Sequence, residues 1–439
     1  MTDPTTPTHV AVIGGGICGL AAAHRLARRG TRVTLLESSD QLGGLGTFFA
    51  HGDRWVERFY HCIMPTDASL LALLGELGLR DAVQWRDTTM GMIVDGRRHP
   101  FNSALDLLRF SALRLPDRVR FGVVSLLLRR LGQGRDLDTL RTEDWLRGLY
   151  GDVVWERLFA PMFGSKFGPS FGDVPALYLW QRLGRERNVA TRGYPDGGYK
   201  TIIDALRTSI ERAGGVVRTS TPVRRLHSTG GRSVLTLTGG EVFDADHVVS
   251  TVPLPLLRRI ADDALAARLP TTDLPYQGVV TGVFFLRRPV TEHYWTPVLH
   301  SGTEFDGVVA MSALAGDHDG RHLVYVMHYT DRDSQLYLDD DAAIAARWSA
   351  QLRGLYPELG ADGIEEVRVF KAPFVEPVYP LGYLAARPPV TVEGTNLLLA
   401  TTAHVYPDVT SWNSSVALAE EVTGRIVPTD QPAVGTPVR

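Results

Sequence analysis

Gly14, Gly16 and Gly19 form the pattern Gly-x-Gly-x-x-Gly near the start of the chain. The pattern directly follows a short β-branched run that ends at Ile13, and it precedes a predicted helix over residues 17–29. In such a loop the first glycine permits a tight turn, the second lets the backbone approach a pyrophosphate, and the third lets helix and strand pack closely. The spacing therefore predicts a binding site for a dinucleotide.

The residues around this loop supply hydrogen-bond donors and an acceptor. Gly15 lies within the loop, and Ile17 and Cys18 open the helix, where free N–H groups attract phosphates. Glu37, followed by Ser38, ends a second apolar run, at the point where a carboxylate accepts hydrogen bonds from the ribose hydroxyls of adenosine. A purely structural glycine turn is the alternative interpretation. We favour the dinucleotide site because strand, helix, second strand and acidic residue follow one another in the required order.

Lys166 is a second candidate site residue, because lysine is rare in this chain, which contains only three. It lies in the segment Phe163–Gly168, between two glycines that would let a loop approach a ligand. Lys166 could there hold an anionic substrate group or a catalytic water. An ordinary surface lysine is an equally good interpretation.

The elements that must position these residues indicate an α/β fold. The first strand, helix and second strand form a β-α-β unit, which predicts a Rossmann-type, doubly wound parallel sheet. Residues 102–183 have a helical pattern and predict a helical insert. Runs at 278–286, 307–311 and 322–329 have strand character with no long helix between them, which predicts an antiparallel sheet. Residues 396–400 begin a last strand-turn-helix unit.

Length and composition exclude several classes of protein. The 439 residues suggest two or three domains, and 44% hydrophobic with 22% charged residues is ordinary for a globular chain. A net charge of −3 predicts no attraction of nucleic acids or acidic membranes. Two cysteines form no disulfide framework, and no secretory signal precedes them, so we expect a cytoplasmic protein. The apolar run 121–128 is too short to span a bilayer, although a surface-associated or substrate-channel helix stays open.

The stretch LLESSDQLGGLGTFF, residues 35–49, resembles the flavin-dependent amine oxidase superfamily, which includes protoporphyrinogen oxidase, phytoene desaturase and UDP-galactopyranose mutase. In that superfamily the second strand ends in Glu, and a glycine pair shortly afterwards passes close to FAD. The resemblance extends over essentially the whole chain, through YPDGGYKTIIDALRTSIERAGGVV, DADHVVSTVP and NLLLATTAHVYPDVTSWNSSVALA. It implies FAD as the cofactor, with Gly43, Gly44, Leu45 and Gly46 close to it.

The resemblance also assigns residues farther along the chain. Val223 is expected near the adenine through its backbone. The family often has Gly-Asp after the closing strand, whereas this chain has Ala400-Thr401-Thr402. Asp408 and the amides near Asn413 to Val416 are therefore expected to substitute for it. The closing segment has no cysteine, which implies non-covalent FAD.

His61 becomes a candidate for the flavin face, because the superfamily brings the segment after the glycine pair past the isoalloxazine. A histidine there can accept a proton while a hydride leaves for flavin N5. A packing or flavin-positioning histidine is the alternative.

These residues predict an FAD-binding part (residues 1–100, 190–260 and 376–425), a helical substrate-capping insert (101–189) and an antiparallel-sheet substrate domain (261–375). The expected function is FAD-dependent dehydrogenation of a C–N, C–O or C–C bond in a small molecule, as in a biosynthetic tailoring step. A sugar-nucleotide isomerase of the UDP-galactopyranose mutase type, which uses reduced FAD without net oxidation, is the alternative. We expect no nucleic acid, metal or integral membrane segment, and the sequence leaves the oligomeric state open.

Overall fold

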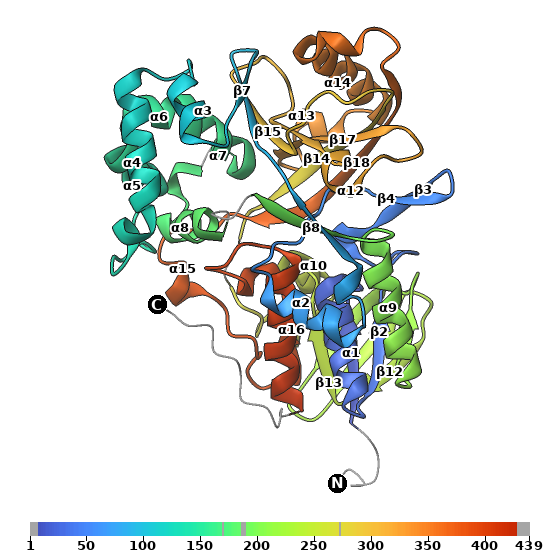
Figure 1. Cartoon of the computed structure of the whole chain (residues 1–439). Helices are drawn as coiled ribbons and strands as arrows, with labels where there is room; N and C mark the ends of the chain where they lie inside the picture. The colour runs from blue at the N-terminus through green and yellow to red at the C-terminus, as the bar shows by residue number, and fades with distance from the viewer. Residues whose placement is uncertain (1–7, 169–170, 186–189, 272–273, 428–439) are drawn as a thin grey trace.

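Figure 1 shows a computed structural model that describes residues 8–168, 171–185, 190–271 and 274–427. A five-stranded parallel sheet has the order β19-β13-β1-β2-β9. Its strands are β1 (His9–Ile13), β2 (Arg32–Leu36), β9 (Val216–Arg218), β13 (His247–Ser250) and β19 (Leu397–Leu399). Segments from both ends and the middle of the chain thus build one sheet, and the predicted α/β class is confirmed.

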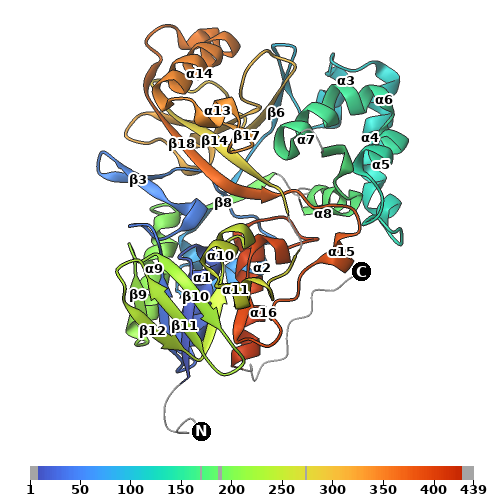
Figure 2. The ribbon, with the colours of Figure 1, turned by 180° about the vertical axis from the view of Figure 1, so that it is seen from behind.

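Both faces of this sheet are covered, which explains why its strands are nearly continuous apolar runs. Helices α1 (Ile17–Arg28), α9 (Tyr199–Arg212) and α16 (Trp412–Ile426) pack together on one side. On the other side lies a small antiparallel sheet, visible in Figure 2. It consists of β10 (Val223–Ser228), β11 (Ser233–Leu237) and β12 (Val242–Ala245).

A seven-stranded sheet forms a second layer above the first, with the order β18-β14-β17-β16-β15-β6-β7. Its strands are β18 (Ile364–Pro377), β14 (Tyr276–Leu286), β17 (His322–Thr330), β16 (Gly307–Ala310), β15 (Trp295–Leu299), β6 (Gly91–Val94) and β7 (Arg97–Pro100). All neighbours are antiparallel except β15 and β6. Residues 91–100, which we expected in the FAD-binding part, extend this sheet instead, because β6 pairs with β15. Helix α14 (Asp341–Leu355) covers one face and buries Trp348 completely.

A helical insert stands beside the two sheets (Figure 1). It contains α3 (Ala104–Arg109), α4 (Leu115–Gly132), α5 (Thr142–Tyr150), α6 (Asp152–Val154), α7 (Ala160–Phe167) and α8 (Ala176–Arg185), with a π-helical turn at Trp155–Phe159. The expected loop at Phe163–Gly168 is helical through Phe167, because Pro161 lies in the first turn of α7 and Gly168 ends the helix with φ of +74°. None of the helices in the described parts combines the length and apolar character that crossing a bilayer requires.

Candidate functional site

The glycine loop connects β1 to α1, and the carboxylate of Glu37 holds it in place. The N–H of Gly15 donates to Oε2 of Glu37 at 2.7 Å, while Ser38 Oγ (3.1 Å) and the N–H of Ser39 (2.8 Å) donate to Oε1. A Cβ on Gly19 would lie 1.9 Å from the carbonyl oxygen of Gly14, so helix and loop touch as predicted. A carboxylate accepts about four hydrogen bonds. Oε2 of Glu37 therefore keeps capacity for a ligand hydroxyl.

A second glycine loop, Gly43–Gly46, lies directly against the first. The N–H of Gly43 donates to the carbonyl of Gly15 at 2.8 Å. A Cβ on Gly16 would meet only the Cα of Gly44, at 3.9 Å, so the space beside Gly16 is open. Gly16 is also the N-cap of α1, with no side-chain cap and no acidic residue in the first turn. The unsatisfied N–H groups of the helix start, at Ile17 and Cys18, suit a phosphate group.

The segment after β19 closes this region from the other side. A Cβ on Gly46 would lie 2.4 Å from the ring of Trp412, the first residue of α16. The thiol of Cys18 donates to the carbonyl of Ala400 at 3.5 Å, and burial raises the pKa of this thiol to about 12. Cys18 is therefore a protonated thiol, and its contribution to the site is its backbone. The N-terminus of α1, the second glycine loop and the N-terminus of α16 meet at one place.

The remaining residues expected to contact the cofactor differ in their surroundings. Oδ1 of Asn413 accepts from the N–H of Leu70 at 3.1 Å, so its side chain ties α16 to α2 (Ala68–Glu76). Val416 is completely buried and lies past the first turn of α16, where the N–H groups of Ser411 and Ser414 already donate to each other's hydroxyl groups. Asp408 is exposed on the preceding turn. Val223 begins β10, and the N–H of Thr221 just before it donates to the carbonyl of Glu37 at 2.8 Å.

His61 lies in an irregular segment after β4 (Arg54–Glu57) and packs between two aromatic rings. Its ring centroid is 5.1 Å from that of Tyr199 and 5.8 Å from that of Trp412. Nδ1 lies 2.8 Å from the carbonyl oxygen of Phe59, which can only accept, so Nδ1 carries the proton. Desolvation lowers the pKa of His61 to about 4, against the opposing effect of that hydrogen bond. His61 is thus neutral at pH 7, with Nε2 as an acceptor.

Lys166 is not an exposed lysine. Its Nζ lies 3.2 Å from Oε2 of Glu376, and only 15% of the Lys166 side chain is accessible. Oε1 of Glu376 accepts the hydroxyl of Tyr178 from α8. Lys166 also faces the ring of Tyr329, at 5.1 Å from the centroid. The structure therefore joins Lys166 to a buried carboxylate between the insert and β18.

Three residues of this region had no predicted role: Glu57, Glu376 and Trp412. Glu57 is buried, and its carboxylate accepts the N–H of Tyr199 and the hydroxyl of Tyr194, each at 2.7 Å. Desolvation raises the pKa of Glu57, and these hydrogen bonds oppose that shift. Glu57 thereby fixes the start of α9 and the ring that His61 contacts. A lone acidic residue among aromatic ones, as in Trp55–Tyr60, was the available sequence signal.

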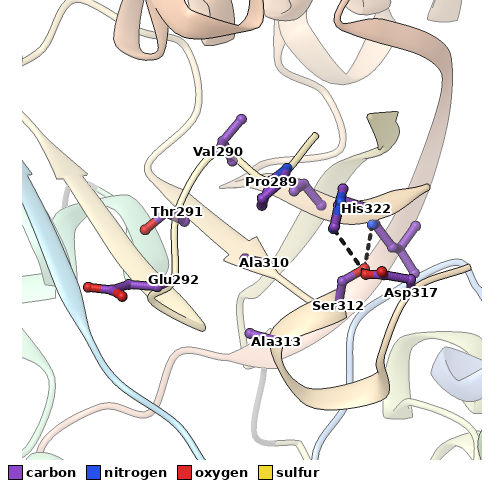
Figure 3. A pocket seen from close by; sticks show the side chains of 11 residues that line it. Pro289, Val290, Thr291, Glu292, Ala310, Ser312, Ala313, Asp317 and His322 are labelled. Carbon is purple, nitrogen blue, oxygen red and sulfur yellow. Dashed lines mark hydrogen bonds and ion pairs between the residues drawn. The ribbon is translucent and has the colours of Figure 1, made fainter. Parts of the chain in front are cut away.

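The cavity in Figure 3 belongs to another part of the molecule. It has a volume of about 250 Å³ and lies where the inner strand β16 ends and β17 begins, lined also by residues 289–292 and the turn between these two strands. His322 Nδ1 lies 3.0 Å from Asp317, but Ser312 Oγ accepts the N–H of Leu323 rather than contacting the imidazole. This group therefore does not form a serine nucleophile, and its lining includes neither glycine loop nor His61.

Comparison with known proteins identifies the family. The sequence pattern of the flavin-containing amine oxidoreductases matches residues 17–407. The chain is 25% identical to the 15-cis-phytoene desaturase of Capsicum annuum over 279 residues, which cover 58% of this chain and 48% of the desaturase. The chain thus spans about half the length of the curated relatives it matches.

Two solved structures share the fold over nearly the whole chain. A protein from Exiguobacterium sp. 255-15, provisionally described as a protoporphyrinogen oxidase, superposes with a TM-score of 0.77 at 19% identity, covering 96% of this chain and 99% of the other. Reduced UDP-galactopyranose mutase superposes with a TM-score of 0.74 at 16% identity, covering 96% of each chain.

Proposed function

Because the chain belongs to the flavin-containing amine oxidoreductase family, we propose that it binds FAD non-covalently and oxidises a small molecule. The observation that carries the proposal is the convergence of two glycine loops and the uncapped N-terminus of α1 around the open side of Gly16, with the ring of Trp412 against Gly46. Diphosphate groups require such N–H donors and the absence of side chains.

The residues around Gly16 suit the parts of an FAD molecule. The N–H groups of Ile17 and Cys18 would hold the diphosphate, and the free capacity of Glu37 Oε2 suits a ribose hydroxyl. Gly44 and Gly46 belong to the loop that would approach the flavin side, next to Trp412. Of the C-terminal residues, Asp408 and the amide of Asn413 fit a cofactor role better than Val416, whose backbone lies inside the helix.

FAD, when bound, supplies the acceptor for a hydride from a C–H bond next to nitrogen, oxygen or a conjugated system. His61 is proposed to lie at the flavin face, where Nε2 accepts a proton from the substrate or positions the ring system. The pair Lys166–Glu376 joins the insert to the substrate sheet, and we propose that it borders the substrate region. The insert and the seven-stranded sheet would exclude water from the bound substrate.

The test is the cofactor content and the reductive half-reaction of the purified protein. We expect a yellow protein that releases intact FAD on denaturation, because no cysteine anchors the cofactor in the closing segment. Anaerobic addition of candidate amines, alcohols or polyene substrates should bleach the flavin absorption for the right class. A colourless protein that cannot be reconstituted with FAD would refute the cofactor assignment.

The same experiment separates oxidation from isomerisation. A mutase reaction needs reduced flavin and leaves its redox state unchanged, so its substrate does not bleach oxidised FAD and is converted only after dithionite reduction. Such a result with a sugar nucleotide would replace the oxidoreductase proposal, while bleaching by a substrate supports it.

A further inference from the structure

Helix α4 is apolar on two opposite faces. Phe121, Val124 and Leu128 point inward and pack on the core of the insert. Leu115, Val119, Val123 and Leu126 recur every three or four residues and therefore form a second stripe along the helix. Leu126 is 76% exposed and Leu115 is 58% exposed, so this stripe faces away from the protein.

The outward stripe of α4 continues onto the neighbouring helix. Leu105 and Leu108 of α3 are exposed, as is Leu127, and α3 packs against α4 at the outer side of the insert (Figure 1). These seven side chains are nearly half of the fifteen large hydrophobic side chains that are exposed in the described chain. The concentration of exposed apolar residues therefore indicates that this surface is covered by something else.

The charges around the stripe indicate what covers it. Residues 104–132 contain six arginines and two aspartates, a net charge of +4 in a chain whose overall charge is −3. Asp106 is occupied by hydrogen bonds to Asn102 and Ser103. Arg118 and Arg120 donate to backbone carbonyls of the insert, and Arg129 lies over the ring of Trp180. The other three arginines, Arg109, Arg114 and Arg130, are exposed. The whole-chain charge of −3 therefore hides a local basic surface. The expectation that the protein is not attracted to acidic membranes does not apply to this surface.

An apolar stripe flanked by arginines matches an anionic lipid surface. The apolar side chains enter the boundary between head groups and acyl chains, while the arginines face the phosphates. A second copy of this chain fits less well, since a two-fold interface would bring arginines against arginines. We propose that the outward faces of α3 and α4 bind the surface of an anionic bilayer, with the helices lying parallel to it.

The test is flotation of the full-length protein with vesicles of defined composition. We expect binding to equimolar phosphatidylglycerol and phosphatidylcholine vesicles, and weak binding to phosphatidylcholine alone. The variant Leu115→Ser/Val119→Ser/Val123→Ser/Leu126→Ser should reduce the partition coefficient by at least about tenfold, because binding scales with buried apolar area. Replacing Arg109, Arg114 and Arg130 by Gln should lower binding to anionic vesicles about fivefold per residue. Raising the salt concentration to about 1 M should also lower binding to anionic vesicles.

A matched control removes exposed apolar side chains elsewhere. Val216→Ser/Val242→Ser/Leu338→Ser/Leu384→Ser changes four residues that are exposed outside the insert, and it should float like the wild type. Circular dichroism and gel filtration show that each variant is folded, so the test does not depend on the redox proposal. The membrane proposal is wrong if the wild type stays unbound at saturating anionic lipid or if the stripe variant still floats. A dimer that the stripe variant converts to a monomer would assign the surface to a second copy instead.

Discussion

At the scale of single residues, His61 combines a fixed orientation with a low proton affinity. Its Nδ1 proton is donated to the Phe59 carbonyl, and the rings of Tyr199 and Trp412 flank it. Desolvation lowers its pKa to about 4, which keeps Nε2 free to accept a proton but makes the conjugate acid strong. Transient proton acceptance and simple positioning of the flavin are both compatible with this geometry, and they differ in kinetics.

We predict that His61→Ala retains FAD and slows flavin reduction by about 10²–10⁴-fold if His61 accepts the substrate proton. Anaerobic stopped-flow measures this step apart from reoxidation. If His61 only packs against the ring system, reduction should stay within about tenfold of the wild type, equivalent to about 1.4 kcal/mol of barrier, while the absorption spectrum or FAD affinity changes.

The pH dependence gives a second readout of the same role. A base must be deprotonated to act, so with a pKa near 4 the rate of reduction should be constant above about pH 5 and fall as the pH decreases through 4. An inflection near 6.5 that disappears in His61→Ala would contradict this environment for His61.

Lys166 and Glu376 form an ion pair whose role is also open. Only 4% of the Glu376 side chain is accessible, so Lys166→Met removes a cation from a buried carboxylate that keeps its hydrogen bond from Tyr178. We predict that this substitution lowers the free energy of unfolding by about 3 kcal/mol. Urea unfolding followed by tryptophan fluorescence measures the change.

The double variant Lys166→Met/Glu376→Gln is the control, because it removes both charges and should regain most of the stability. If the double variant is stable yet reduces its flavin more than about a hundredfold more slowly, Lys166 or Glu376 acts on the substrate. A Lys166→Met protein with an unchanged unfolding midpoint would contradict the importance of the ion pair.

At the scale of elements, the two glycine loops meet at Gly16. This residue has φ of −71°, and a Cβ there would meet only the Cα of Gly44, at 3.9 Å, so a Cβ by itself disturbs no packing of the protein. Gly19 differs, since its Cβ would overlap the backbone of Gly14. Gly16 is thus a glycine that a bound ligand would require, whereas Gly19 is one that the fold requires.

We predict that Gly16→Val folds with an unchanged circular dichroism spectrum but loses FAD, because the branched side chain fills the space proposed for the diphosphate. The ratio of flavin to protein absorption measures occupancy. Gly231→Val is the matched control, since Gly231 also has open space where its Cβ would be but lies in the turn between β10 and β11, at the opposite end of that hairpin from Val223. Full FAD occupancy in Gly16→Val would remove the loop from the proposed site.

At the scale of the whole molecule, buried polar contacts connect the insert to the closing segment. Asp138, which follows α4, accepts the hydroxyl of Tyr406 and the N–H of Leu384 at 3.1 Å. The hydroxyl of Tyr379 donates to the carbonyl of Thr402 at 2.9 Å. The insert is therefore coupled to the loop that precedes α16.

We predict that Asp138→Ala loosens both regions, since it leaves the buried hydroxyl of Tyr406 without its acceptor at a cost of about 1–3 kcal/mol. Hydrogen–deuterium exchange should increase in peptides covering 137–141 and 402–410. The control Asp152→Ala removes a carboxylate that is 77% exposed and pairs with Arg147 inside the insert, so its effect should stay local. An increase confined to the insert in both variants would contradict the coupling.

The fold class and the first glycine loop could be predicted from the sequence, because both depend on local patterns. Gly14, Gly16, Gly19 and Glu37 are linked by a strand and a helix whose geometry is nearly invariant. The helical insert and the antiparallel sheet likewise follow from periodicity within each segment. By contrast, only the tertiary structure brought β6 next to β15 and Glu376 next to Lys166.

Those pairings join residues about 200 positions apart, and nothing in the local pattern of either segment encodes its partner. The same reason explains Trp412, which packs against Gly46 and His61 although both lie far away near the start of the chain. It also explains the outward stripe of α4, because the spacing of apolar residues in a sequence is the same whether the face they form packs on protein or faces solvent. Tertiary packing alone decides which apolar face of a helix is left exposed.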